Sequence, residues 1–168
     1  MVLASVVIHI MPHLSTLGIP RTTAGVMAAA IPLISIIGRF VFGWLGDIFD
    51  KRYVMALAFS FMAIGVLLLP FIDALPWLVL FFVLFPAGLG GLSVLRGTIL
   101  REYYDAHTFG TRMGLMMGFA AGGGIIGPTL TGWIFDVSGS YQAVWLGFSV
   151  LLILALGLIV RIDKRVSP

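Results

Sequence analysis

The stretch Gly43-Trp44-Leu45-Gly46-Asp47-Ile48-Phe49-Asp50-Lys51-Arg52 separates two long apolar segments. The segment before it, Thr23 to Gly46, has Arg39 as its only charged residue, and the segment after it, Tyr53 to Ile72, has none. About 20 consecutive apolar residues are enough to cross the hydrocarbon core of a bilayer as a helix. The quoted stretch is therefore predicted to end one membrane-spanning helix and to turn into the next.

Apolar segments of similar length fill the rest of the chain. Of the 168 residues, 60% are hydrophobic and only 10% are charged, whereas a soluble domain has about 25% charged residues. So much apolar surface needs lipid around it, and the alternation of period two that marks barrel strands is absent. We therefore expect an all-α membrane protein, a bundle of six transmembrane helices. The spans are predicted at residues 1–17, 23–46, 53–72, 76–97, 112–136 and 141–161.

The first span differs from the others because it is short and contains Pro12. We interpret it as a spanning helix whose beginning is truncated. A re-entrant or interfacial helix is the alternative. His9 and His13 in this segment are expected to pack against neighbours or to lie at the interface, with a proton relay as the alternative role.

Basic residues gather at alternate ends of the predicted helices. In short loops, Lys and Arg accumulate on the cytoplasmic side. The basic residues of the second connection, the fourth connection region and the tail are Lys51, Arg52, Arg96, Arg101, Arg112, Arg161, Lys164 and Arg165. The opposite side carries only Arg21. We therefore expect a multi-pass protein of the plasma (inner) membrane with a cytoplasmic carboxy terminus.

The pattern Gly-Trp-aliphatic-x-Asp-aliphatic occurs twice, at Gly43–Ile48 and at Gly132–Val137. Each copy ends a predicted span, the second and the fifth. Three helices separate the copies, so they face opposite sides of the membrane. This arrangement indicates an inverted repeat of three plus three helices.

The quoted stretch also resembles the signature loop of the major facilitator superfamily, Gly-x-Leu-x-Asp-(Arg/Lys)-x-Gly-(Arg/Lys)-(Arg/Lys). The matching positions are Gly43, Leu45, Asp47, Lys51 and Arg52. Ile48 and Asp50 depart from the motif, as the degenerate second copy in such transporters often does. The resemblance implies that residues 1–168 are the carboxy-terminal half, helices 7 to 12, of a 12-helix transporter.

This resemblance also implies a partner and a gating role. The partner is the missing amino-terminal six-helix half of the same protein. The gating residues are Gly43, Asp47, Lys51 and Arg52. In the family the motif aspartate latches onto a helix amino terminus of the other half, where the helix dipole is positive. Asp47 is expected to act in that way, and a solvated loop aspartate is the alternative.

The run Gly38-Arg39-Phe40-Val41-Phe42-Gly43 is similar to helix 8 of the oxalate/formate antiporter and monocarboxylate transporter branch. An arginine there binds the substrate carboxylate, and Arg39 matches it. A charge two turns inside Asp47 needs a polar cavity or a partner, and a guanidinium matches a carboxylate bidentately. Ser35 lies on about the same helix face. Arg39 and Ser35 are therefore predicted to bind substrate. A structural arginine, or one that reaches the cytoplasmic interface, is the alternative.

The fifth span is rich in glycine. Gly114, Gly118 and Gly122 are spaced by four, which favours close helix packing in lipid, and Gly127-Pro128 is predicted to pack or bend the helix. The span contains no lysine, so it lacks the second cation that some members of the branch carry there. Gly122–Gly127 also fits G-x-G-x-x-G, but no strand precedes it, so a nucleotide is not expected.

These features favour secondary active transport of a small organic anion, such as a mono- or dicarboxylate, by alternating access. A coupling proton or a counter-substrate would drive it. No enzyme activity, cofactor, metal site or nucleic-acid partner is expected. The alternatives are a complete six-helix homodimeric transporter, an intramembrane enzyme, which the missing catalytic constellation disfavours, and a non-transporting membrane scaffold.

Overall fold

The computed structural model describes residues 1–72, 75–103 and 106–161, and in these ranges it contains helices and no strand. The elements are α1 (Val2–Thr16), α2 (Arg21–Ile48), α3 (Lys51–Leu68), the short 3-10 helix η1 (Leu69–Phe71), α4 (Leu75–Tyr103), α5 (Ala106–Ser138) and α6 (Gln142–Val160). All the α-helices except α1 are long and apolar enough to cross a membrane. The predicted all-α membrane bundle is confirmed.

The helices α4 and α5 extend beyond the predicted spans at the end where they meet. The apolar runs predicted residues 76–97 and 112–136, whereas the helices cover Leu75–Tyr103 and Ala106–Ser138. Hydropathy marks the part of a helix that lies in hydrocarbon, and charged residues such as Arg96 and Arg101 do not end a helix. The additional turns therefore carry the polar residues that the sequence assigned to a loop.

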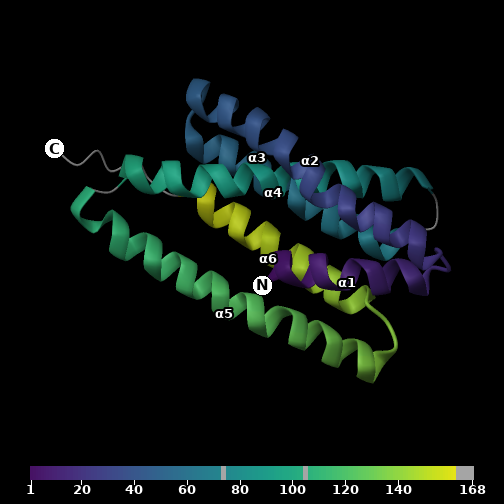
Figure 1. Ribbon diagram of the computed structural model, residues 1–168. Helices are drawn as coiled ribbons and strands as arrows, with labels where there is room; N and C mark the ends of the chain where they lie inside the picture. Colours follow the sequence, from purple (N-terminus) through teal and green to yellow (C-terminus); the bar gives the residue numbers. More distant parts are fainter. Residues whose placement is uncertain (73–74, 104–105, 162–168) are drawn as a thin grey trace.

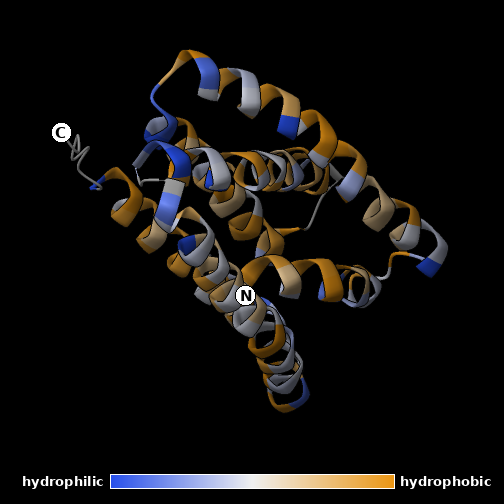
Figure 2. Ribbon diagram, turned by 60° about the vertical axis from the view of Figure 1, so that its left-hand side comes forward, coloured by the Kyte–Doolittle hydropathy of each residue, from blue (hydrophilic) through white to orange (hydrophobic). Residues whose placement is uncertain are grey.

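Successive helices run back and forth between two ends of the bundle (Figure 1). The turn between α2 and α3, the last turns of α4 and the end of α6 lie together at one end, on the left of Figure 1. An ion pair of 2.9 Å between Lys51 Nζ and Glu102 Oε2 joins the start of α3 to the end of α4. The basic connections thus share one end, as predicted. Apolar residues cover the middle of the helices, and most hydrophilic ones lie toward their ends (Figure 2).

Glycines bring α2 and α4 into backbone contact. A Cβ added at Gly38 would collide with the backbone oxygen of Ala87, and one added at Gly90 would collide with the backbone oxygen of Ser35. A Cβ at Gly91 would lie 2.6 Å from the Phe42 ring. Small residues allow this approach in lipid, where packing replaces the hydrophobic effect as the force between helices. The tight contact in this chain therefore lies between the second and fourth helices.

The two copies of the repeated pattern occupy equivalent places. Gly43 faces α4 and Gly132 faces α1, each in ordinary contact: the nearest atom to an added Cβ is 3.8 Å away for Gly43 and 3.6 Å for Gly132. The tryptophans that follow, Trp44 and Trp133, point outward and are 64% and 62% exposed. Exchanging α1–α3 with α4–α6 turns the α2–α4 contact into the α5–α1 contact, as an inverted repeat requires.

The equivalence extends five residues before each pattern. Gly38 on α2 is pressed against the backbone of α4. Gly127 on α5 is pressed against α1, where an added Cβ would lie 2.7 Å from Ser5 Oγ. The longer pattern Gly-x₄-Gly-Trp-x₂-Asp therefore describes both helices, with each glycine on the face toward the partner helix.

The predicted packing glycines of α5 divide into two groups. Gly127 packs against α1, and the carbonyl oxygen of Pro128 lies 3.1 Å from His9 Nε2. Around Gly114, Gly118 and Gly122, an added Cβ would meet nothing within 4 Å among the described residues. α5 continues as one helix through Pro128. A packing role for Gly114, Gly118 and Gly122 stays a prediction.

Candidate functional site

A cleft of about 630 Å³ opens between the first four helices. It is lined by Leu3, Ala4 and Val7 of α1, by Arg39 of α2, by Met55, Phe59 and Met62 of α3, and by Leu89, Leu92, Ser93 and Arg96 of α4. Its size is that of a small-molecule site, and its walls are apolar with a few polar groups, as such sites commonly are. We take this cleft as the candidate site.

Helical periodicity explains why these residues meet. The α4 residues follow the spacing i, i+3, i+4, i+7, and the α3 residues follow i, i+4, i+7, so each set forms one face of its helix. The helices α3 and α4 therefore each present one continuous row of side chains to the cleft. Arg39 is the residue that α2 contributes to the lining among the described residues. Because the rows belong to packed helices and not to loops, the cleft has rigid walls.

Arg39 reaches the cleft from the place where α2 touches α4. A Cβ added at Gly90 would lie 2.7 Å from the backbone nitrogen of Arg39, so the two backbones are in direct contact. The Arg39 side chain is exposed and makes no hydrogen bond or ion pair within residues 1–72, 75–103 and 106–161. The cleft therefore receives a positive charge whose position depends on the glycine contact beneath it.

Arg96 supplies a second positive charge to the same cleft. It lies six residues after Gly90, which is roughly 9 Å further along the axis of α4 at 1.5 Å per residue. Its side chain is exposed and likewise has no hydrogen-bond or ion-pair partner in the described part of the chain. Among the described residues, no acidic side chain lines the cleft. The cleft thus offers two guanidinium groups among apolar walls, a field that attracts anions.

Sequence reasoning counted Arg96 among the basic residues of the fourth connection region and missed its place in the cleft. The signal was its spacing of three, four and seven residues from Ser93, Leu92 and Leu89, which puts all four on one face. Reading that face required knowing which side of α4 meets the other helices. Sequence periodicity alone does not give this.

Ser35 lies outside this lining. It is 4% exposed on the side of α2 that meets α4, and its hydroxyl donates to the carbonyl oxygen of Pro32 at 2.7 Å. Ser93 is the hydroxyl residue of the cleft, and its proton is donated to the carbonyl oxygen of Gly90 at 2.7 Å. The structure therefore brings Arg39 together with Ser93 and Arg96, and it does not bring Ser35 into that group.

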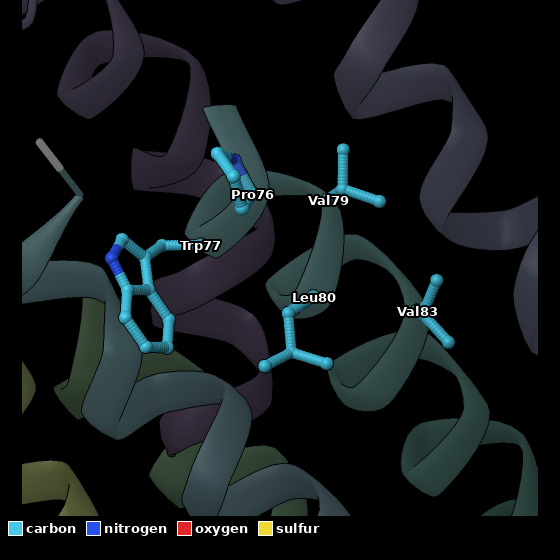
Figure 3. Close-up of a pocket in the computed structure, with 5 residues that line it drawn as sticks. All are labelled: Pro76, Trp77, Val79, Leu80 and Val83. Carbon is cyan, nitrogen blue, oxygen red and sulfur yellow. The ribbon is translucent and has the colours of Figure 1, made fainter. Parts of the chain in front are cut away.

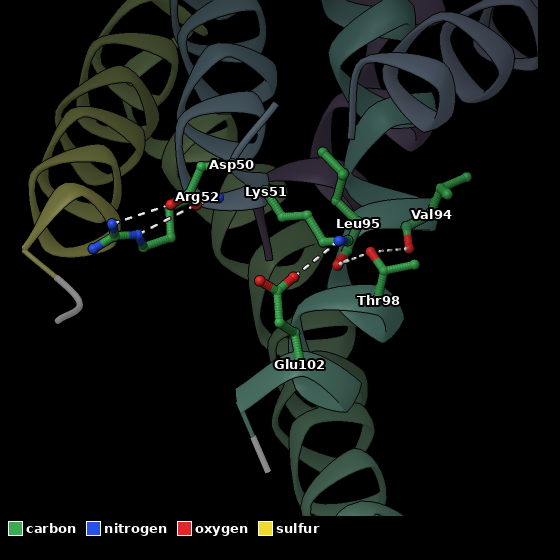
Figure 4. A network of polar contacts seen from close by, with 7 residues as sticks. All are labelled: Asp50, Lys51, Arg52, Val94, Leu95, Thr98 and Glu102. Carbon is green, nitrogen blue, oxygen red and sulfur yellow. Dashed lines mark hydrogen bonds and ion pairs between the residues drawn. The ribbon is translucent and has the colours of Figure 1, made fainter. Parts of the chain in front are cut away.

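The loop after α2 holds two ion pairs (Figure 4). Lys51 pairs with Glu102, as described above. The Asp50 carboxylate accepts hydrogen bonds from the Arg52 backbone nitrogen at 2.9 Å and from its guanidinium at 3.2 and 3.3 Å. Asp50, which stands where the motif has glycine, therefore caps the amino terminus of α3. Asp47 is exposed and has no such contact among the described residues.

His9 and His13 lie toward the opposite end of the bundle, next to the start of α6. His13 Nε2 lies 3.2 Å from the carbonyl oxygen of Leu69, and the His13 ring packs edge-on against Tyr141 with the ring centroids 5.5 Å apart. His9 Nδ1 lies 3.4 Å from the Tyr141 hydroxyl. Both imidazoles tie α1 to neighbouring elements, and neither lines the cleft.

A second hollow, of about 550 Å³, lies near the start of α4 (Figure 3). Its lining is Pro76, Trp77, Val79, Leu80 and Val83, which is apolar throughout. Such a surface matches lipid better than a polar solute. Among the described residues, no group of three or more His, Asp or Glu side chains is placed to hold a metal ion.

Comparison with known proteins identifies transporters as relatives of this chain. A sequence model described as Major Facilitator Superfamily matches residues 1–168. Monocarboxylate transporter 12 of Mus musculus is 28% identical over 166 residues, which cover 95% of this chain and 34% of that protein. Monocarboxylate transporter 13 of Rattus norvegicus is 24% identical over 162 residues, which cover 95% of this chain and 38% of that protein.

Another relative is monocarboxylate transporter 2 of Homo sapiens, 24% identical over 153 residues, which cover 89% of this chain and 32% of that protein. The chain therefore spans about a third of the length of these relatives. No solved structure matches the chain significantly.

Proposed function

The chain belongs to the major facilitator superfamily, and from that premise we propose that it supplies one wall of the transport site in a carrier of small organic anions. Residues 1–168 act as the carboxy-terminal six-helix half. The matching amino-terminal half closes the open side of the cleft. Two observations support this: the cleft lies open beside α1, α3 and α4, and the chain spans about a third of the length of its relatives.

The substrate class follows from the charges of the cleft, which is the observation that carries the proposal. Arg39 and Arg96 have no partner among the described residues, and no acid lies in the lining, so a cation would be repelled. Arg39 binds a carboxylate through its planar fork of N–H donors. The apolar walls accept the carbon skeleton. The names of the relatives, monocarboxylate transporters, agree with a carboxylate substrate.

Alternating access supplies the mechanism. The two halves rock about the bound anion, and a coupling proton or a counter-substrate drives net movement. Asp47 latches the cytoplasmic side by contacting a helix amino terminus of the other half. The basic end of the bundle, with the carboxy terminus, faces the cytoplasm at the plasma membrane.

Uptake of a radiolabelled small carboxylate into proteoliposomes containing the complete protein tests the substrate role. Replacing the guanidinium in Arg39→Gln removes a charge-assisted interaction and is expected to lower uptake by about 10- to 100-fold. Arg39→Lys keeps the positive charge but loses the planar fork of donors, so its uptake is expected to lie between that of the unmodified protein and that of Arg39→Gln. Arg21→Gln, at the far end of the same helix, is the matched control and leaves uptake unchanged. Undiminished uptake by Arg39→Gln overturns the proposal.

A further inference from the structure

We propose that Arg96 is a second anion ligand of the cleft, and that the cleft takes a small dicarboxylate with an apolar spacer. The inference rests on the proposed function, in which Arg39 binds the first carboxylate. Beyond the proposed function, the inference specifies that the substrate carries two negative charges, and it names Arg96 as the residue that selects for the second charge.

The positions of the two arginines allow one molecule to touch both. α2 and α4 run side by side in the same direction, because Gly38 meets Ala87 and, further along, Gly46 meets Leu95. Arg39 is level with Gly90, and Arg96 lies roughly 9 Å further along the bundle. Both side chains enter one cleft of about 630 Å³. A short dicarboxylate lying along the two helices can therefore place one acid group at each guanidinium.

Charge balance favours a dianion over a monoanion. A guanidinium stays protonated at any physiological pH, so the cleft always carries two positive charges. The described residues of the lining include no acid, and apart from the two arginines they are apolar except Ser93. A monocarboxylate neutralises one charge and leaves the second without a counter-charge in the cleft. A dicarboxylate compensates both.

The remaining lining defines the spacer between the acid groups. Leu89 and Leu92 on α4 and Met55, Phe59 and Met62 on α3 present only carbon and sulfur to the cleft. The Ser93 hydroxyl already donates its proton to the Gly90 carbonyl oxygen. A polyhydroxylated acid would leave its hydroxyl groups without partners against these walls. The spacer is therefore a short hydrocarbon chain.

Succinate and butyrate make the test direct, because both have four carbons and they differ in the number of carboxylates. The complete protein in proteoliposomes at pH 7 is expected to take up succinate with at least about tenfold lower half-saturating concentration than butyrate. Arg96→Gln is expected to raise the half-saturating concentration of succinate by about tenfold and to change that of butyrate by less than about threefold. Arg96→Lys, which keeps the charge, retains most of the preference.

Arg101→Gln is the matched control, because Arg101 is an exposed arginine of the same helix that does not line the cleft. Arg101→Gln is expected to leave the half-saturating concentrations of both substrates unchanged. The inference is overturned if butyrate is preferred, or if Arg96→Gln folds and leaves the succinate-to-butyrate ratio unchanged. In either case uptake of butyrate that depends on Arg39 leaves the proposed function standing. If neither anion enters and Arg39→Gln changes nothing, both proposals fail.

Discussion

Lys51 at the start of α3 and Glu102 near the end of α4 form an ion pair, with 2.9 Å between Nζ and Oε2. The two side chains are 27% and 28% exposed, so the pair is only partly shielded from water. Partly exposed pairs of this kind contribute up to about 1 kcal/mol. Its main effect is therefore to hold the turn after α2 against α4, where the signature loop meets the long fourth helix.

Reversing the Lys51 charge tests this contact. Lys51→Glu puts two carboxylates together and is expected to lower the thermal midpoint of the complete protein in detergent by a few degrees. The exchange Lys51→Glu with Glu102→Lys restores most of the loss because the pair re-forms with opposite polarity. Lys51→Ala, which removes the attraction without adding repulsion, lies between them. Equal midpoints for the single reversal and the exchange would show that the pair has no energetic role.

Gly90 provides a sharper test of packing. Its missing Cβ makes room for the backbones of Ser35 and Arg39, and backbone atoms cannot move aside as a flexible side chain can. Gly90→Ala is expected to destabilise the protein by about 1–3 kcal/mol, the usual range for overpacking. It also displaces Arg39, so transport falls with stability.

Gly97→Ala is the matched control for that measurement. Gly97 lies on the same helix, and an added Cβ there meets nothing within 4 Å. Alanine favours a helix more than glycine does, so the thermal midpoint should stay the same or rise. A similar loss in both variants would mean that helix propensity, and not the contact between α2 and α4, decides the outcome.

These contacts mark the limit of what the sequence predicts. The number, type and order of the helices follow from apolar runs, because the thickness of the bilayer converts run length directly into spans. Which faces of those helices meet does not follow. Spacing by four singled out Gly118, where an added Cβ would meet no other helix within 4 Å among the described residues, whereas Gly38 and Gly90 make the close contact.

The residues of the candidate site also differ in how far the sequence indicates them. Arg39 was predicted from the sequence because a lone charge inside an apolar run is conspicuous. Arg96 was not, because it stands at the end of its run, where a charge is ordinary. Ser35 was assigned by its position one turn before Arg39, yet its side chain is buried against α4. A helix face becomes a binding face only through its neighbours, and those neighbours are distant in the sequence.

The orientation of the bundle is open to chemical labelling, since the chain has no cysteine of its own. Phe49 and Ser138 are exposed at the ends of α2 and α5, on opposite ends of the bundle by the inverted repeat. A membrane-impermeant thiol reagent added outside intact cells is expected to label Ser138→Cys and to spare Phe49→Cys. Permeabilised cells should label both, and the unmodified protein supplies the background. The reverse pattern would place the basic end outside the cell.

Two aspartates of the signature loop are expected to behave differently when each is neutralised. Asp50 caps α3 and binds Arg52, so Asp50→Ala should cost about 1 kcal/mol of stability. Asp47 is exposed and makes no such contact within the described residues, so Asp47→Asn should lower the thermal midpoint of the complete protein in detergent less than Asp50→Ala does. If Asp47 is the latch to the other half, its neutralisation shifts the balance between inward-open and outward-open forms.

Asp47→Asn should therefore slow uptake several-fold while substrate binding, measured by thermal stabilisation at saturating succinate, is retained. Asp50→Ala should show the converse: lower stability with near-normal transport per folded molecule. Asp47→Glu keeps the charge and is expected to preserve part of the rate. The latch assignment does not survive if Asp47→Asn transports normally, because an aspartate that only contacts solvent can lose its charge without effect on the conformational change.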